Sequence, residues 1–350
     1  ENEPNTTTND FGAYELNIPN SFDTNNNGIF DIEEGLLVAS GGTDTATGLS
    51  LATPVTALAD SEVITLLTSL VTDLVNQGLS VEQANNQVTT ALSIPTDIDI
   101  LTLDPIVATN NNQPGGVETF AAMVKTQNLI TQTAALLAGI SNSSISEMTD
   151  EVVAAITNEI QSNGSLNLTD TEQLETIIEA AATNASADVS EIKDEVALVI
   201  AEANQQIDNA VANSSPDSLE SEFANIQKIS LDKTTSDLQQ AGAGNKSIED
   251  VVAENTGSAL DDLIAGNVTP PEDVDFVSLN WVQQFGGTFA DSGFGVAADE
   301  LGNSYITGQF QLDANFGSTT VTTTGINDAF VAKLDSRGDL IWVENFNGTS

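Results

Sequence analysis

The sequence contains no cysteine and no histidine, and only 7 of its 350 residues are lysine or arginine. Without cysteine and histidine the chain has no thiol nucleophile, no zinc site built on these residues and no histidine general base. A catalytic site would have to use paired carboxylates, or serine with lysine. The sequence also has no phosphate-binding loop and no nucleophile-elbow motif. We therefore expect a protein that is not an enzyme.

Basic residues are scarce, whereas 52 residues are acidic, which gives a formal net charge of −45 at pH 7. Nucleic acid is excluded as an expected partner, because its binding requires clustered lysine and arginine. Anionic membrane surfaces are disfavoured for the same reason. No apolar run reaches the ~20 residues of a membrane span. Cations are the expected partners, in a setting rich in salt or divalent ions that screens the repulsion.

The most specific motif is a calcium-loop spacing over residues 23–34. Oxygen-bearing side chains stand at loop positions one, three, five and nine, with glycine at six and glutamate at twelve, as in an EF-hand. Gly28 supplies the sharp turn at position six. The expected calcium ligands are Asp23, Asn25, Asn27, the carbonyl of Ile29, Asp31 and a bidentate Glu34. The alternative interpretation is an asparagine-rich turn with acidic neighbours.

The flanks of this loop differ from those of a paired EF-hand. Residues 14–21 look extended and include Pro19, so the incoming helix is missing. The loop therefore resembles the single calcium loops of dockerins and other secreted modules. Residues 33–39 predict a short outgoing helix, and residues 40–48 a linker. We interpret residues 1–52 as an acidic N-terminal segment that carries the calcium loop.

Residues 53–266 have the apolar periodicity of helices. A first helix is expected from Val63 to Leu74 with Ser61 as its cap, and Ser80 should cap the next. Further helices are expected over residues 117–139, 145–161, 169–183, 189–210, 217–240 and 248–264. The apolar stripe over residues 189–210 could pack inside a bundle or form a coiled coil with another chain. The sequence predicts an all-α bundle that could divide into two subdomains near residue 141.

Three aspartates, Asp97, Asp99 and Asp104, lie in the turn-rich connection over residues 94–105. They could bind a second calcium ion, or they could form turns and cap a helix, which the sequence favours.

The order of segments in this region resembles a helical module of large bacterial surface and adhesin-like proteins. Thr53-Pro54-Val55-Thr56-Ala57-Leu58 is followed by a helix pair, by Leu103-Asp104-Pro105 and by a long helix. In those proteins the module often follows a short acidic calcium loop. The resemblance covers roughly residues 20 to 140 and implies a secreted protein at the bacterial cell surface.

Beyond residue 266 the pattern becomes alternating, aromatic and rich in glycine. Trp281–Gly287 returns as Trp342–Gly348, 61 residues later. These residues, together with residues 295–299, 302–308 and 328–335, are similar to the bacterial SBBP β-propeller repeat. The resemblance implies that residues 267–350 form one antiparallel blade. Because a propeller closes with about four or more blades, we expect further repeats or pairing with another chain. Asp299, Asp328 and Asp335 could be ligands, although blade turns commonly use aspartate.

The expected fold class is multidomain α plus β: an N-terminal calcium loop, a central all-α bundle and a C-terminal propeller-like blade. We expect a non-catalytic, calcium-binding protein of the cell surface or extracellular matrix that acts as an adhesin or structural spacer. One alternative is a self-assembling filament or sheath subunit bridged by calcium, and another is a carboxylate-based hydrolase. Expected partners are calcium ions, further copies of the chain, and other surface proteins or glycans.

Overall fold

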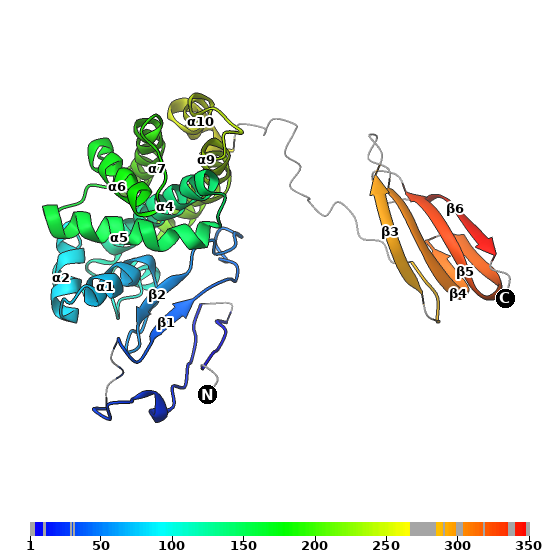
Figure 1. Cartoon of the computed structure of the whole chain (residues 1–350), viewed down its shortest axis with the longest axis horizontal. Coiled ribbons are helices and arrows are strands. Elements are labelled where there is room, and N and C mark those ends of the chain that lie inside the picture. The colour runs from blue at the N-terminus through cyan, green and yellow to red at the C-terminus, as the bar shows by residue number, and fades with distance from the viewer. Residues whose placement is uncertain are drawn as a thin grey trace. The chain divides into compact units, whose positions relative to one another are not determined.

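The computed structural model describes residues 4–9, 12–28, 30, 32–266, 285–289, 291–298, 304–317, 319–334 and 340–347. The chain divides into two compact units, Glu1–Val268 and Thr269–Ser350 (Figure 1). The first unit is mainly helical and the second contains an antiparallel sheet. The predicted combination of a helical central region and a C-terminal β unit is thereby confirmed.

The first unit contains a small antiparallel sheet. Strand β1 (Leu36–Ala39) pairs with β2 (Val55–Leu58), with Leu36 opposite Leu58. The prediction of a helix over residues 33–39 is wrong, since residues 36–39 form a strand. Pairing with the buried strand β2 overrides the local preference of this short segment. Residues 40–54 connect the two strands and include a bridge between Thr43 and Ser50. The sheet thus attaches the acidic N-terminal segment to the helical bundle.

Helix α1 (Leu66–Asn76) begins later than predicted. Its N-cap is Thr65, which forms a reciprocal capping box with Thr68. Ser61 is not the cap, because the backbone N–H groups of Glu62 and Val63 both bond to the carbonyl of Leu101 and hold the chain outside the helix. The next helix, α2 (Val81–Ala91), begins at Ser80 as predicted, with a capping box to Gln83.

The remaining helices follow the predicted order, apart from the short helix α3, which the sequence did not predict, and two interruptions of longer helices. They are α3 (Pro105–Asn110), α4 (Gly116–Ser141), α5 (Ile145–Asn163), α6 (Thr171–Asn184), α7 (Lys193–Asn213), α8 (Pro216–Lys228), α9 (Thr235–Gly242), α10 (Ile248–Asn255) and α11 (Gly257–Ile264). The helix predicted over residues 217–240 is interrupted by a π-helical segment, Ile229–Thr234. The helix predicted over residues 248–264 breaks before Gly257, whose φ is +54°.

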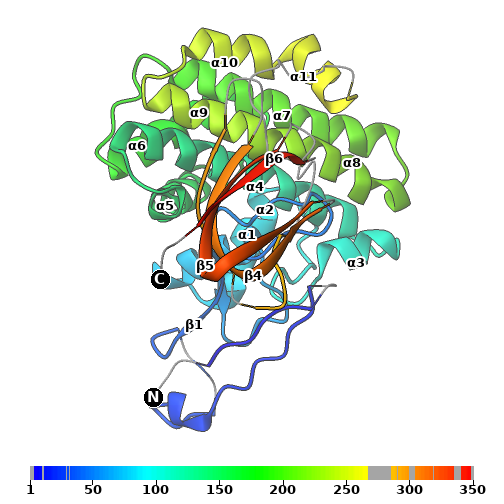
Figure 2. The ribbon, with the colours of Figure 1, turned by 90° about the vertical axis from the view of Figure 1, so that its right-hand side faces the viewer.

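Helix α4 runs through the centre of the bundle, and 18 of its 26 residues are buried. Helices α5, α7 and α9 all pack against it (Figure 2). The apolar stripe of α7, which includes Val196, Val199 and Ile207, is buried inside this unit. The bundle interpretation of that stripe therefore fits the structure better than a coiled coil with another chain. One core cluster includes residues on both sides of residue 141.

The crossing of α4 and α9 is unusually close. A Cβ atom added at Gly139 would lie 2.1 Å from the carbonyl oxygen of Gln239. A Cβ atom added at Gly242 would lie 2.2 Å from the carbonyl oxygen of Leu136. Glycine at both positions lets the two helix backbones touch, and any side chain would separate them.

The second unit is a four-stranded antiparallel sheet with the order β3-β4-β5-β6. The strands are β3 (Ser292–Ala298), β4 (Ser304–Phe316), β5 (Thr319–Leu334) and β6 (Leu340–Asn347). Its core contains Phe310, Phe316 and Phe330, and the ring centroids of Phe316 and Phe330 are 4.8 Å apart. The strand number is that of one propeller blade. The residues that the structure describes form an open sheet and not a closed propeller.

We predict that Gly139→Ala and Gly242→Ala each destabilise the first unit. Alanine in a helix normally stabilises by about 1 kcal/mol relative to glycine, but here the added methyl group meets backbone atoms that cannot rotate away. We expect a net loss of about 1–3 kcal/mol in the free energy of unfolding, measured by urea denaturation. The double variant should lose less than the sum, because either methyl group alone separates the helices. Ser141→Ala, at an exposed position of α4, is the control. If all three single variants had the same free energy of unfolding, the close crossing would be contradicted.

Candidate functional site

The structure describes four of the six predicted calcium ligands: Asp23, Asn25, Asn27 and Glu34. The other two, Ile29 and Asp31, lie outside the described residues. Asp23 organises the turn, since its Oδ1 accepts a hydrogen bond from the N–H of Asn27 (3.1 Å). The Oδ2 atom of Asp23 accepts one from the N–H of Gly28 (2.9 Å). Gly28 has a φ of +82°, in agreement with its predicted role at position six.

Glu34, at position twelve, reaches back to the beginning of the loop. Its Oε1 accepts hydrogen bonds from the N–H groups of Thr24 (2.6 Å) and Asn25 (3.1 Å). The hydroxyl of Thr24 donates to the same oxygen (2.9 Å). The carboxylates of Asp23 and Glu34 therefore both bind the backbone of residues 24–28. The spacing places the first and last predicted ligands at the same short turn.

The donor set suits a hard cation, because calcium prefers carboxylate, amide and carbonyl oxygens. An ionised carboxylate offers about four lone-pair sites, so the bonds to backbone N–H groups leave capacity for a cation. Within the described part of the chain, no three aspartate or glutamate side chains are grouped as a metal site. The described residues of this loop supply two carboxylates, Asp23 and Glu34, and two amides, Asn25 and Asn27.

The candidate second calcium site in the connection before α3 is not assembled. Asp99 Oδ1 accepts a hydrogen bond from the N–H of Leu101 (3.0 Å) and forms a turn. Asp104 is the N-cap of α3, since its Oδ1 accepts from the N–H groups of Ile106 and Val107. Asp97 lies exposed in the same connection. The turn and capping roles that the sequence favoured are therefore found for Asp99 and Asp104.

Among the described residues of the second unit, no group of carboxylates forms a metal site. Asp328 is buried in strand β5. Asp299 and Asp335 lie outside the described residues.

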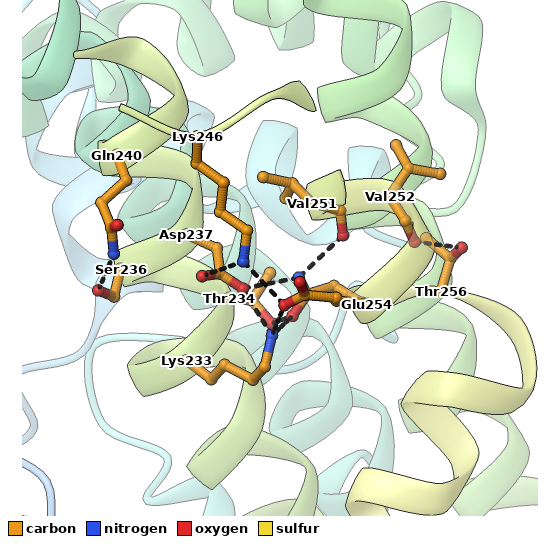
Figure 3. Close-up of polar contacts among 11 residues, drawn as sticks. Lys233, Thr234, Ser236, Asp237, Gln240, Lys246, Val251, Val252, Glu254 and Thr256 are labelled. Atoms are coloured by element: carbon orange, nitrogen blue, oxygen red, sulfur yellow. Dashed lines mark hydrogen bonds and ion pairs between the residues drawn. The ribbon is translucent and has the colours of Figure 1, made fainter. Parts of the chain in front are cut away.

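A charged cluster that the sequence analysis did not identify lies between α9 and α10 (Figure 3). We call it the Asp237 network, and it consists of Lys233, Thr234, Asp237, Lys246, Glu254 and Asn255. Lys233 Nζ lies 2.6 Å from Asp237 Oδ2, and Lys246 Nζ lies 2.8 Å from Asp237 Oδ1. Both ammonium groups also contact Glu254 Oε2, at 2.9 and 2.8 Å. Two of the seven basic residues thus share two carboxylates.

Asn255 completes the interior of the Asp237 network. Its Nδ2 donates to Asp237 Oδ2 (2.9 Å) and to the carbonyl of Val251 (2.8 Å). Its Oδ1 accepts from the hydroxyl of Thr234 (2.9 Å). Asn255 and Thr234 are each 1% exposed, and Asp237 is 7% exposed. These polar groups are therefore removed from water and satisfied by one another.

Protonation in the Asp237 network is controlled by the opposite charges. Burial would raise the pKa of Asp237, but hydrogen bonds from Lys233, Lys246 and Asn255 outweigh this effect and hold the pKa below its usual value. Burial would lower the pKa of Lys246, but hydrogen bonds to Asp237 and Glu254 raise it above the usual lysine value. The hydrogen bond from Lys246 lowers the pKa of Glu254. Asp237, Lys246 and Glu254 are therefore charged near neutral pH.

Local structure explains how the network forms. Lys233 belongs to the π-helical segment and stands four residues before Asp237 on α9, so their side chains meet on one face. Glu254 and Asn255 are the last residues of α10. The Lys233–Asp237 spacing was visible in the sequence, whereas the approach of α10 depends on tertiary packing.

Comparison with known proteins identifies one matching family model, described as the SBBP beta-propeller repeat, over residues 280–309. No curated protein and no solved structure matches the chain significantly. The match includes β3 and the first part of β4 and agrees with the predicted C-terminal repeat. Throughout the part of the chain that the structure describes, every helix is too short or too polar to cross a membrane.

We predict that Asp237→Asn lowers the free energy of unfolding by about 2–3 kcal/mol at pH 7. Breaking a buried ion pair costs about 3–5 kcal/mol. Because both lysines are partly exposed, we expect a loss at or below the lower limit of this range. Because the pKa of Asp237 is lowered in the folded state, its contribution is present above the ordinary value of 3.8 and is lost as the pH falls through the folded pKa. The difference between the wild type and the variant should therefore shrink below pH 4, in urea denaturation followed at several pH values.

Asp232→Asn is the matched control for this measurement. Burial raises the pKa of Asp232, so removing its charge should leave the stability at pH 7 unchanged or slightly increased. A loss equal to that of Asp237→Asn would contradict the assignment of the stabilisation to the Asp237 network.

Proposed function

We propose that the chain is a non-catalytic, calcium-binding protein of the extracellular surface, in which a calcium loop stiffens the attachment of a helical spacer. The observation that carries the proposal is the position of Glu34, whose carboxylate returns to the N–H groups of Thr24 and Asn25 at the start of the loop. These bonds bring the position-twelve carboxylate to the start of the loop, where the position-one carboxylate of Asp23 also binds the turn, and one calcium ion bound by both positions would need this proximity.

The loop is mechanically coupled to the bundle. Ile32, within the loop, and Leu36, at the start of β1, both pack against the main hydrophobic core of the first unit. Strand β1 pairs with β2, and the backbone of Thr56 on β2 bonds to α1. Its N–H donates to the hydroxyl of Ser69, and its carbonyl accepts from the hydroxyl of Thr68. Ordering of the loop by calcium would therefore restrict the N-terminal segment relative to the helices. The loop acts as a structural clip and not as a sensor.

Charge and architecture support an extracellular role. A net charge of −45 is best tolerated where salt and divalent cations are plentiful. The resemblance of residues 20–140 to a surface-protein module and the beta-propeller repeat at residues 280–309 fit a mosaic protein that displays or spaces binding modules. Its partners would be calcium ions together with surface proteins or glycans.

We predict that calcium raises the stability of the N-terminal segment. Extracellular calcium loops have Kd values on the order of 10⁻⁴ to 10⁻³ M, so about 10 mM calcium should contribute roughly 1.4–2.7 kcal/mol. Thermal unfolding and limited proteolysis over residues 20–50 should show this protection in the wild type and lose it after EGTA is added. Glu34→Gln should abolish the calcium response.

Glu33→Gln is the matched control, because the neighbouring side chain is exposed and occupies a loop position without a ligand role. It should keep the calcium response. If EGTA leaves both the melting temperature and the cleavage pattern of the wild type unchanged, the calcium proposal is wrong.

The surface of the second unit favours self-assembly as a second candidate function. Phe294, Val296, Trp342 and Phe346 are between 39% and 75% exposed on this sheet. Strands β3 and β6 are its two edges and could pair with strands of another copy. This candidate is a filament or sheath subunit in which calcium bridges the acidic surfaces.

We predict for this candidate that sedimentation velocity shows concentration-dependent association that increases with calcium. Phe346→Ser should weaken the association, because it removes an exposed aromatic side chain from the edge strand. Val38→Ser, at a position of β1 that is 60% exposed in the first unit, is the control. A monomer at every protein and calcium concentration would exclude assembly.

A further inference from the structure

We propose that Lys233 and Asn255 form an intramolecular isopeptide bond that covalently joins the π-helical segment to the end of α10. The proposal concerns the Asp237 network and is independent of calcium binding. It follows from the positions of four groups: an amine, a carboxamide, a carboxylate that touches both, and a hydroxyl on the carboxamide oxygen.

The amine nitrogen that would attack and the amide nitrogen that would leave both bind to one oxygen atom. Asp237 Oδ2 accepts hydrogen bonds from Lys233 Nζ (2.6 Å) and from Asn255 Nδ2 (2.9 Å). Lys233 Nζ also lies 3.5 Å from Asn255 Oδ1, so the amine stands beside the carboxamide that it would attack. Attacking and leaving nitrogen atoms are thus bound to the same carboxylate oxygen, which is the position required of a proton shuttle.

The carboxamide oxygen is also held by a donor. The hydroxyl of Thr234 donates a hydrogen bond to Asn255 Oδ1 (2.9 Å). This oxygen gains negative charge when the amine adds to the Cγ atom, and a fixed donor stabilises that charge. Asn255 and Thr234 are almost fully buried, so water is kept away from the Cγ atom and attack by the amine is favoured over hydrolysis.

The reaction balances without another reagent. The Lys233 ammonium transfers a proton to Asp237, and the neutral amine forms a bond from Nζ to Asn255 Cγ. The bond from Cγ to Nδ2 then breaks. Both protons that Nζ loses pass through Asp237 to the leaving nitrogen, which departs as ammonium, while Asp237 returns to its carboxylate form. One ammonium ion is released for each amide bond formed.

The other two charged groups hold the shuttle in place. Lys246 Nζ contacts Asp237 Oδ1 (2.8 Å), which leaves Oδ2 to the two reacting nitrogen atoms. Glu254 Oε2 accepts from both lysines and helps to place the Lys233 ammonium. We therefore regard Lys246 and Glu254 as positioning residues, and Lys233 as the nucleophile because it is the lysine that contacts Asn255.

The cross-link would serve a chain that has no cysteine. Lys233 and Asn255 are 22 residues apart in the sequence. A covalent bond between them restricts the unfolded chain as a disulfide does, and it does not depend on the redox state of the surroundings.

The mass of the intact, denatured full-length chain tests the proposal directly. We expect a mass lower than the sequence mass by one ammonia molecule. An unchanged mass would overturn the proposal. Loss of one water molecule would also overturn it, because water is released when a lysine joins to aspartate or glutamate instead of asparagine.

Tryptic mapping locates the bond, because the chain has only seven cleavage residues. Without a cross-link, trypsin releases peptides 229–233, 234–246 and 247–333. With it, cleavage after Lys233 is blocked, and residues 229–246 remain joined to peptide 247–333. Release of free peptide 229–233 from the wild type would contradict the assignment.

Variants identify the nucleophile and the electrophile. Lys233→Arg keeps the positive charge but should eliminate the loss of ammonia, and Asn255→Ala should eliminate it as well. Lys228→Arg, at an exposed lysine of α8 outside the network, is the matched control and should retain the loss. If Lys246→Arg eliminates the loss while Lys233→Arg retains it, the nucleophile is assigned wrongly and the proposal fails.

Discussion

The close crossing of α4 and α9 is the contact on which the C-terminal half of the helical unit depends. Gly139 and Gly242 allow the two backbones to touch, which fixes the position of α9 and of the π-helical segment before it. Gln132 of α4 donates from Nε2 to the carbonyl of Ser230 in that segment (3.1 Å), and the hydroxyl of Thr235 donates to the same oxygen (2.9 Å). A carbonyl in an irregular turn is thereby satisfied from a neighbouring helix.

The π-helical segment has a consequence for the charges that follow it. A π turn changes the helical phase relative to a continuous α-helix, and Lys233 and Asp237 lie at its end and just beyond it. Together they face the last turn of α10, where Glu254 and Asn255 lie. Close packing on one side of α9 and ionic contact on the other thus fix the same short helix. A buried hydrogen bond from Asn128 Nδ2 to Asn204 Oδ1 (3.0 Å) also joins α4 to α7.

The sequence predicted those features that depend on short-range patterns. The cap at Ser80, the turn at Gly28 and the positions of Asp23 and Glu34 all follow from the types and spacing of nearby residues. It failed where a distant partner decides the conformation. Residues 36–39 become a strand because β2 lies beside them. Ser61 loses its capping role because the carbonyl of Leu101 binds the N–H groups of Glu62 and Val63, which follow it. The Asp237 network required knowledge of how α9 meets α10, which no local pattern contains.

The two copies of the aromatic repeat in the second unit have different surroundings. Phe285, in the first copy, stacks on Phe316 with ring centroids 5.2 Å apart. Phe346, at the equivalent position 61 residues later, is 57% exposed. The phenylalanine of the first copy packs on an aromatic ring of the sheet, whereas that of the second copy is exposed on the edge strand β6. The two copies are therefore chemically unequal, so a stack of such sheets would have a head and a tail, and its growth would be directional.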